Sequence, residues 1–379
     1  MVKNKKKIKT IFEKTLTDVE NNVYLKNWKI NNEDLKMDHK WVIDKRRLEG
    51  GVSDGVDIIT VNNGILSFTV VPTRGMGIWR GEFKGVYLGW NSPVKRLVHP
   101  HYINLETRKG PGYGFNEWAL RCGLEDFPGR IANIPAEAVK VKVTSESNVA
   151  LEVEGVVYEQ AFFGPNFKIS STVSTALNGN TIHVTDLLEN LKSTTQEMQL
   201  LYHCNYGTPF LEEGAHVIAP FKVVVPRDAR AAAGVKCFNI YGPPETGFTE
   251  QVYFCELKGN NGGQTEVALI NRDETKAVSL SFSLKELPCF TLWKNTNSIE
   301  EGYVTGLEPA TFFPNKKIFE RKHNRIINLG PKERYKIELD FSVHLGKEKV
   351  LKLKDKIKIL MKGIEPKIYA KPDPYYSPT

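Results

Sequence analysis

The chain has few cysteines and no long apolar run. These two absences argue against a disulfide-rich protein and against a membrane-spanning protein. Only five cysteines occur among 379 residues, widely spaced and never as C-x-x-C, so neither a disulfide framework nor a cysteine-based zinc site is expected. No apolar stretch approaches the roughly 20 residues that a membrane-spanning helix needs. No apolar segment of a secretory signal follows the basic N-terminus. We therefore expect a cytoplasmic protein with reduced thiols and no membrane partner.

Sequence signals for bound cofactors are also absent. No glycine-rich phosphate loop opens a helix, and strands and helices do not alternate as they do in nucleotide-binding domains. Among the eight histidines only His99 and His101 are close, and Pro100 between them indicates a loop. We expect neither a metal nor an organic cofactor.

The net charge of +8 is unevenly distributed along the chain. Residues 1–10 hold five lysines and no acid, and residues 346–379 hold nine lysines against four acids. The remaining body, residues 11–345, therefore has a net charge of −2. A nucleic-acid-binding domain carries its basic surface on the folded body. No nucleic-acid partner is expected.

In contrast, the chain is rich in alternation with period two. Residues 149–153, 278–284 and 335–343 alternate apolar with polar side chains, which is typical of strands with one buried face. Further strands are expected at Asp57–Val61, Ile65–Val71, Phe167–Leu177, Thr181–Leu188, Glu197–His203, Val217–Val225, Gln251–Leu257, Thr265–Asn271, Cys289–Lys294 and Tyr303–Leu307. This pattern predicts an all-β fold, a large antiparallel β-sandwich with few short helices.

Three parts are expected along the chain. Residues 40–345 contain no linker or internal repeat and are predicted to form a single domain. Residues 1–39 form an N-terminal extension with a basic start, and residues 346–379 form a basic C-terminal tail that contains prolines and is extended from residue 362. The organisation is thus one sandwich with two lysine-rich ends.

Helical signals are sparse and short. Phe12, Leu16 and Val19 have helical spacing and predict a short helix in the N-terminal extension. Phe115–Arg121 is a second candidate for a short helix. Lys347–Met361 fits a strand and a helix equally well, so both remain open.

Two expected strand ends carry titratable side chains between apolar neighbours. His203, within Leu200–Gly207, shares a strand face with Asn205, and its ordinary pKa near neutrality suits a general acid. The alternative is a buried histidine that is bonded to the backbone. Glu308, within Gly302–Thr311, ends an apolar strand, where a raised pKa would suit a general base. The alternative is an exposed glutamate.

Two further segments have the composition of a binding site. Arg74 lies beside two glycines in Val71–Ile78, where the backbone can approach a ligand and the guanidinium can donate several hydrogen bonds; the alternative is a turn with a solvated arginine. Residues 90–130 mix aromatic and polar side chains, as sugar sites do. The cluster comprises Trp90, Asn91, His99, His101, Asn104, Asn116, Glu117, Trp118, Arg121, Glu125 and Arg130.

Taken together, these segments resemble a known family. The similarity rests on PTRGMGIWRGEFKGVYLGWNSPV, GFNEWALRCGLE, LLYHCNYGTPFLEEGA, VPRDARAAAG, LPCFTLWKN and GYVTGLEPAT, and it covers roughly residues 40–345. The chain resembles the aldose 1-epimerase-like proteins of unknown function, the domain family numbered 4432, within the galactose-mutarotase-like superfamily. The resemblance implies a large antiparallel sandwich with a sugar cleft across one sheet.

The resemblance also implies site residues. Mutarotases interconvert the anomers of a reducing sugar, using a glutamate base and a histidine acid to open the ring. Glu308 of GLEPAT matches the base, and His203 of YHCNYG matches the acid. Under this assignment, the further contacts to the sugar would come from Arg121 or Arg74, which would hold ring or exocyclic oxygens, and from Asp228 of VPRD, Asn104, Asn116, Asn205, His99 and Arg130.

One position departs from the family pattern. Relatives often carry a histidine before the Gly-Arg of a GRIAN-like segment, and here that position is Pro128, whose side chain neither donates nor accepts a hydrogen bond. His99 or His101 could replace it, the substrate could differ, or catalysis could be weak. The first hypothesis is a cofactor-free epimerase acting on a neutral sugar, as a monomer or homodimer. The alternatives are a non-catalytic sugar-binding or regulatory module, and a lyase or isomerase acting on an acidic sugar that arginines would bind.

Overall fold

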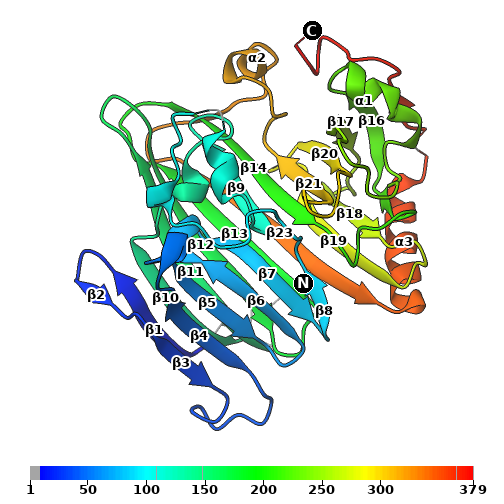
Figure 1. Cartoon of the computed structure of the whole chain (residues 1–379). Helices are drawn as coiled ribbons and strands as arrows, with labels where there is room; N and C mark the ends of the chain where they lie inside the picture. Colours follow the sequence, from blue (N-terminus) through cyan, green and yellow to red (C-terminus); the bar gives the residue numbers. More distant parts are fainter. Residues whose placement is uncertain (1–8, 108, 147, 364, 379) are drawn as a thin grey trace, which may run out of the picture.

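The structure is a computed structural model that describes residues 9–107, 109–146, 148–363 and 365–378. Two large sheets contain the described strands (Figure 1). The ten-stranded sheet runs in the order β15 (His216–Ile218), β18 (Gln264–Ile270), β19 (Lys276–Ser283), β23 (Arg334–Leu345), β13 (Thr181–Asn190), β12 (Asn166–Ala176), β11 (Val149–Gln160), β10 (Ala138–Ser145), β1 (Lys9–Asp18) and β2 (Val23–Tyr24).

The second sheet has 14 strands and carries the candidate site. Its order is β24 (Lys367–Ile368), β16 (Phe221–Pro226), β17 (Gln251–Leu257), β20 (Cys289–Asn295), β21 (Val304–Ala310), β14 (Gln196–Tyr206), β9 (Ala119–Leu124), β7 (Gly77–Phe83), β6 (Leu66–Val71), β5 (Asp57–Asn62), β4 (Val42–Arg47) and β3 (Trp28–Asn31), while β22 (Ile327–Leu329) pairs with β14 and β8 (Val86–Leu88) with β7. The described pairings are antiparallel apart from that of β16 with β24. The predicted all-β sandwich is confirmed.

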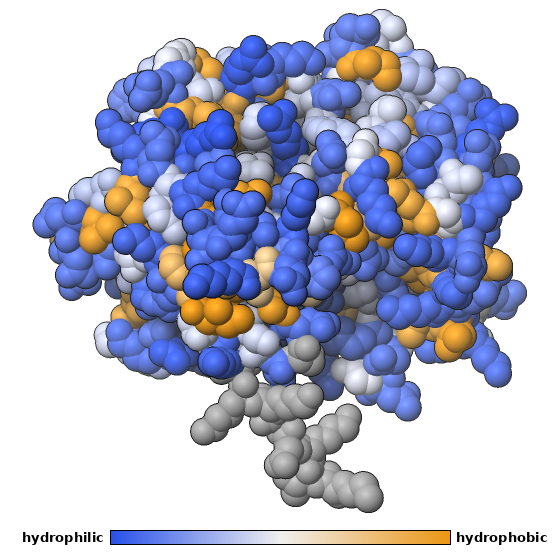
Figure 2. All heavy atoms as spheres, turned by 90° about the horizontal axis from the view of Figure 1, so that it is seen from below, coloured by the Kyte–Doolittle hydropathy of each residue, from blue (hydrophilic) through white to orange (hydrophobic). Residues whose placement is uncertain are grey.

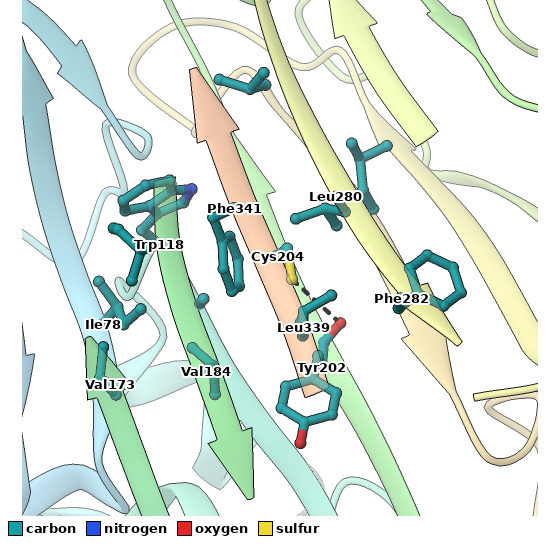
Figure 3. Close-up of a cluster of buried hydrophobic side chains, with 14 of the residues drawn as sticks. Ile78, Trp118, Val173, Val184, Tyr202, Cys204, Leu280, Phe282, Leu339 and Phe341 are labelled. Atoms are coloured by element: carbon teal, nitrogen blue, oxygen red, sulfur yellow. Dashed lines mark hydrogen bonds between the residues drawn. The ribbon is translucent and has the colours of Figure 1, made fainter. Parts of the chain in front are cut away.

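The main core fills the space between the two sheets. Side chains from the two layers meet there, for example Trp118 and Phe341, whose ring centroids are 5.7 Å apart, and Val184 of β13 (Figure 3). In β11 the alternation seen in the sequence becomes two faces, since Leu151 and Val153 are buried while Glu152 and Glu154 are half-buried. Burial of one face of each sheet stabilises the sandwich by about 25 cal/mol per Å² of apolar area removed from water.

Every expected strand is present, with one difference and several additions. Val217–Val225 forms two strands, β15 and β16, which are separated at Ala219-Pro220 because proline has no N–H for a ladder hydrogen bond. The strands that were not expected are β1, β2, β3, β4, β7, β8, β9, β10, β22 and β24. The helix expected at Phe115–Arg121 is wrong, because the segment enters strand β9 at Ala119.

The helix expected in the N-terminal extension is also wrong. Phe12 and Leu16 belong to strand β1, which pairs with β10. The register of β1 shifts between Thr10 and Phe12 and again between Thr15 and Thr17. Phe12 and Leu16 are four residues apart, and this separation places two side chains on one face of a strand as well as of a helix, so their spacing does not distinguish the two elements. The first four lysines of the basic start lie outside the described residues.

The C-terminal tail packs against the sandwich. Lys347–Met361 forms helix α3, which decides between the two alternatives, and its Val350, Leu353 and Ile357 are buried against β18 and β19 (Figure 1). Beyond it, β24 pairs with β16 and Tyr376 is buried. The lysines of α3 therefore lie on a helix whose opposite face covers the ten-stranded sheet.

The remaining helical elements among the described residues are short. They are α1 (Ala229–Ala233), α2 (Lys317–Lys322) and six 3₁₀ turns at Gly51–Ser53, Pro72–Arg74, Pro100–Tyr102, Gly110–Gly114, Ile131–Asn133 and Val235–Cys237. No helix within the described ranges is long and apolar enough to cross a membrane. The face shown in Figure 2 is mostly hydrophilic, with small scattered apolar patches.

Candidate active site

Strand β14 has two differently occupied faces. Tyr202 and Cys204 point into the core between the sheets (Figure 3), whereas Leu201 belongs to a separate apolar cluster on the outer face of the 14-stranded sheet. That cluster consists of Leu120, Cys122, Ala132, Leu201, Val225, Val252, Phe254, Cys289, Ala310, Phe312, Phe313 and Tyr376. By the period of two, His203 and Asn205 share the outer face with Leu201.

The register of β14 and β21 brings His203 and Glu308 together. Asn205 pairs with Gly306 in this antiparallel pair, so His203, two residues before Asn205, lies opposite Glu308, two residues after Gly306. Nε2 of His203 is 3.1 Å from Oε1 of Glu308. The glutamate side chain is 4% exposed and the histidine side chain 14%, so the pair is buried but the imidazole reaches the surface.

Gly306 makes room for this contact. A Cβ atom at this position would overlap Oε1 of Glu308 and would lie 3.2 Å from both Cε1 of His203 and Cε3 of Trp293. The absent side chain leaves a hollow that the carboxyl group of Glu308 occupies. A glycine in the interior of a strand commonly marks such a close approach.

Two aromatic rings flank the pair. The ring of Phe115 meets His203 edge-on with centroids 5.0 Å apart, and the ring of Trp293 does so at 5.3 Å. Both aromatic side chains are half-buried. Rings of this kind offer flat apolar surfaces to a ligand that also needs polar partners.

A charged group lies behind Trp293. The indole Nε1–H donates to Oε2 of Glu250 over 2.6 Å, and Nη2 of Arg227 donates to Oε1 of Glu250 over 2.9 Å. Arg227 also contacts Asp228 at 3.0 Å. One arginine thus faces two carboxylates, so the formal charge of this group is −1.

The environment shifts the two pKa values in opposite directions. Burial raises the pKa of Glu308 well above its usual range; the negative charge of Glu250 adds to this rise, and Arg227 opposes it. Burial lowers the pKa of His203 to about 4, with nearby Asn205 and Glu250 partly offsetting the fall. Both shifts favour the neutral forms of the two groups. When both groups are neutral, the pair carries one transferable proton, which is on Glu308.

Several buried polar atoms around the pair have no hydrogen-bond partner among the described residues. They are Nδ1 of His203, Oε1 of Glu308, Oδ1 of Asn205 and Oγ1 of Thr291. Thr291 pairs directly with Glu308 across β20 and β21. Since buried polar groups are nearly always satisfied, a cluster of this kind is typical of a site that a polar ligand completes.

The structure corrects the assignment of Arg121 as a sugar ligand. Alternation along β9 places Leu120 and Cys122 on the outer face and turns Arg121 inward. There its Nε and Nη2 donate to both oxygens of Asp186 over 2.6 and 2.8 Å, and Nη1 donates to the carbonyls of Gly75 and Met76. The guanidinium belongs to the core between the sheets.

Arg74 needs the same correction. It is 2% exposed, and its Nε donates to Oε1 of Glu117 over 2.8 Å. Nη1 donates to Asn133 over 2.6 Å and Nη2 donates to the carbonyl of Gly114 over 3.0 Å. These contacts tie the turn after β6 to the loop before β9 and leave Arg74 no free donor edge for a ligand.

Four other expected ligands take part in local structure away from the pair. Nδ2 of Asn116 donates to two loop carbonyls, those of Val94 and Arg96. His99 accepts from the backbone at the start of the turn Pro100–Tyr102, and Asn104 and Arg130 are exposed. The structure gives none of the four a contact with His203 or Glu308.

Of the expected contact residues, Asn205 lies beside the pair and Asp228 lies at its edge. Asp228 caps helix α1 by accepting from the N–H of Ala231 over 2.9 Å, and it reaches the site only through Arg227. Pro128 is exposed, in the loop after β9. The expected site is thus reduced to a compact group on β14 and β21.

The sequence interpretation missed the flanking residues. These are Phe115, Arg227, Glu250, Thr291, Trp293 and Gly306. Two signals were available: Gly306 interrupts an apolar strand two residues before Glu308, and Thr291 and Trp293 share one face of the expected strand Cys289–Lys294. Glu250 offered no signal of its own. Among the described residues, no group of three His, Cys, Asp or Glu side chains could hold a metal ion.

Comparison with known proteins agrees with this architecture. A crystal structure from Klebsiella pneumoniae subsp. pneumoniae, named "putative aldose 1-epimerase", is 32% identical, with 97% of this chain and 99% of that chain covered and a TM-score of 0.92. A galactose mutarotase-like protein from Clostridium acetobutylicum is 15% identical, with 84% and 99% covered and a TM-score of 0.55.

More distant similarity extends to a galactose mutarotase related enzyme from Lactobacillus acidophilus. It is 10% identical, with 77% of this chain and 99% of that chain covered and a TM-score of 0.51, so it shares the fold. No curated protein matches the chain. The model of a family described as "Domain of unknown function (DUF4432)" matches residues 53–343. The chain therefore belongs to the DUF4432 family and has the galactose-mutarotase-like sandwich fold.

Proposed function

We propose that the protein is an aldose 1-epimerase that interconverts the anomers of a neutral reducing sugar, with Glu308 and His203 as its proton-transfer pair. The observation that carries the proposal is the contact of 3.1 Å between these two side chains, on a sheet face where neighbouring polar atoms lack partners among the described residues. The relative from Klebsiella pneumoniae, which bears the name of the same activity, supports it.

The chemistry follows from the single proton that the pair holds. Moving it from Glu308 to His203 gives a carboxylate and an imidazolium without uptake from solvent. The carboxylate then takes the proton of the anomeric hydroxyl while the imidazolium protonates the ring oxygen, and the C1–O5 bond breaks to give the open-chain aldehyde. After rotation about C1–C2 the two transfers reverse, and the ring closes as the other anomer.

The charges around the pair favour a neutral sugar over an acidic one. Arg74 and Arg121, which would bind a carboxylate, are already paired with Glu117 and Asp186. Arg227 faces both Asp228 and Glu250, so a sugar carboxylate would approach a group of net negative charge. An uncharged sugar avoids that repulsion.

Exchange NMR tests the proposal. Purified protein is added to a panel of neutral aldoses and to a uronic acid, and the rate of exchange between the α and β anomeric signals is compared with that in buffer. We expect faster exchange for at least one neutral aldose and none for the uronic acid. No acceleration with any neutral aldose contradicts the proposal, and calorimetric binding without acceleration would identify a sugar-binding module instead.

A further inference from the structure

We propose that Glu250 is a positioning residue of this site, which holds Trp293 as the wall against which the bound sugar ring packs. This inference rests on the proposed function, because it assigns the surface that the sugar contacts beside the proton-transfer pair. Glu250 itself is placed behind the wall and does not touch the sugar. It acts through the indole.

The contacts of Glu250 form a continuous chain from the backbone to the indole. Oε2 accepts from Nε1–H of Trp293 over 2.6 Å, and Oε1 accepts from Nη2 of Arg227 over 2.9 Å. Nε of Arg227 donates to Oδ2 of Asp228 over 3.0 Å, and Oδ1 of Asp228 accepts from the N–H of Ala231. Each carboxylate oxygen of Glu250 accepts one of these hydrogen bonds. The indole is therefore anchored through Glu250, Arg227 and Asp228 to the start of helix α1.

The indole needs such an anchor because packing alone leaves part of it exposed. Trp293 is half-buried, and two of its neighbours, His203 and Phe115, meet it edge-on, with centroids 5.3 and 6.3 Å away. The C–H face of a sugar packs on flat aromatic surface, and its orientation there decides which oxygens meet Glu308 and His203. A charge-assisted hydrogen bond to the indole N–H is short and directional, which fixes the plane of the ring.

The charge of Glu250 has a second consequence for the same site. Its negative charge raises the pKa of Glu308 and partly offsets the lowering of the pKa of His203. Arg227 acts on Glu308 in the opposite direction. Removing the charge of Glu250 therefore lowers both pKa values of the pair.

The test is Glu250→Gln, measured by exchange NMR across pH. An amide places its oxygen at only one of the two carboxylate positions and an NH2 donor at the other, so one of the donors, Trp293 or Arg227, loses its acceptor. We expect KM to rise about tenfold, because the variant loses one hydrogen bond that holds the indole against which the sugar packs. The fall in kcat should be smaller. Both limbs of the pH–rate profile should also move to lower pH. A purely structural role would lower the melting temperature without moving the profile.

Two variants serve as controls. Glu245→Gln removes an exposed carboxylate from the preceding loop and should leave KM and the pH profile unchanged. Glu250→Asp keeps the charge but shortens the side chain, so it should restore the pH profile while KM stays raised. Together they separate the charge of Glu250 from the position of its oxygens.

The outcomes also separate this inference from the proposed function. If the wild type accelerates exchange and Glu250→Gln matches it in KM and pH profile, the positioning role is overturned while the function stands. If the wild type binds a sugar without accelerating exchange, the function fails, and equal calorimetric Kd values for wild type and Glu250→Gln then overturn the inference. If the wild type binds no sugar of the panel, both are overturned.

Discussion

The two faces of strand β14 differ in how their polar groups are satisfied. Tyr202 faces inward, and its hydroxyl donates to Oδ2 of Asp186 over 2.6 Å, beside the bidentate contact of Asp186 with Arg121. His203, the next residue, faces outward toward Glu308, with Nδ1 unpartnered among the described residues. Both environments are deeply buried, and both contain an acid and a base.

The difference shows how a scaffold ion pair can be told from a reactive one. In the inner pair the guanidinium and the carboxylate are both charged and surrounded by partners, so no proton is available. In the outer pair, burial raises the pKa of Glu308 and lowers the pKa of His203, which favours the neutral form of each group. One proton can then move from Glu308 to His203. Burial and residue type alone do not distinguish a structural ion pair from a reactive pair. The hydrogen-bond partners around each pair do.

The largest effect is expected when the outer pair loses its titratable acid. Glu308→Gln has the shape of the protonated glutamate but cannot accept the proton of the anomeric hydroxyl. We expect exchange to fall by about 10²–10⁴-fold, as for loss of a general acid or base, with the melting temperature nearly unchanged. Exchange NMR and thermal unfolding of the same preparation check both, and undiminished exchange would remove Glu308 from the mechanism.

Breaking the inner pair should act on stability instead. Arg121→Met leaves the carboxylate of Asp186 buried without its cation, which typically costs about 3–5 kcal/mol of unfolding free energy. Denaturant unfolding measures this cost. The double variant Arg121→Met with Asp186→Leu should recover part of the loss. Loss of exchange in a fully folded Arg121→Met protein would show that the two faces are not separate in role.

A milder perturbation tests the hollow above Gly306. Gly306→Ala places a methyl group where Oε1 of Glu308 lies, so the carboxyl group must move away from His203. Since a misplacement of about 1 Å can reduce a rate by about 10²-fold, we expect a loss of about tenfold to a hundredfold in kcat. Gly242→Ala, at an exposed position with open space around it, is the control. Equal rates for both variants would contradict the close approach.

The smallest effect is expected at Glu159, a carboxyl group that is buried between the sheets and has no cation contact among the described residues. Glu159 accepts from the N–H of Leu124 over 2.9 Å, and burial raises its pKa to about 7. The folded protein keeps this proton between about pH 4.5 and 7, whereas the unfolded chain loses it, so the group makes stability fall as pH rises through that range. Glu159→Gln should flatten that slope in unfolding measured from pH 4.5 to 7; an unchanged slope would show that Glu159 ionises normally.

The sequence predicted most of the strands because alternation is local. It failed where the spacing fits both elements, as in β1, where Phe12 and Leu16 are four residues apart and would share one face of a helix as well as of a strand. The fate of Lys347–Met361 depended on whether a neighbouring surface would bury Val350 and Leu353, which the local pattern does not contain. Local periodicity therefore predicts elements better than it predicts their surroundings.

The site was predictable to the same limited extent. His203 and Glu308 carry recognisable motifs, and the register brings them together. The pattern Leu120–Arg121–Cys122 shows that Arg121 opposes its neighbours but not which face of the sheet is the inner one. Glu250 contacts a tryptophan 43 positions away, and only the pairing of β17 with β20 reveals that contact.

The most direct test of the central claim is a crystal structure of the protein soaked with the neutral aldose that exchanges fastest. We expect a sugar on the outer face of β14 and β21, with its anomeric oxygen within hydrogen-bond reach of Glu308 and its ring oxygen within reach of His203. The contact between Arg121 and Asp186 should be unchanged. A sugar bound elsewhere, with the contact of 3.1 Å between His203 and Glu308 intact, would contradict it.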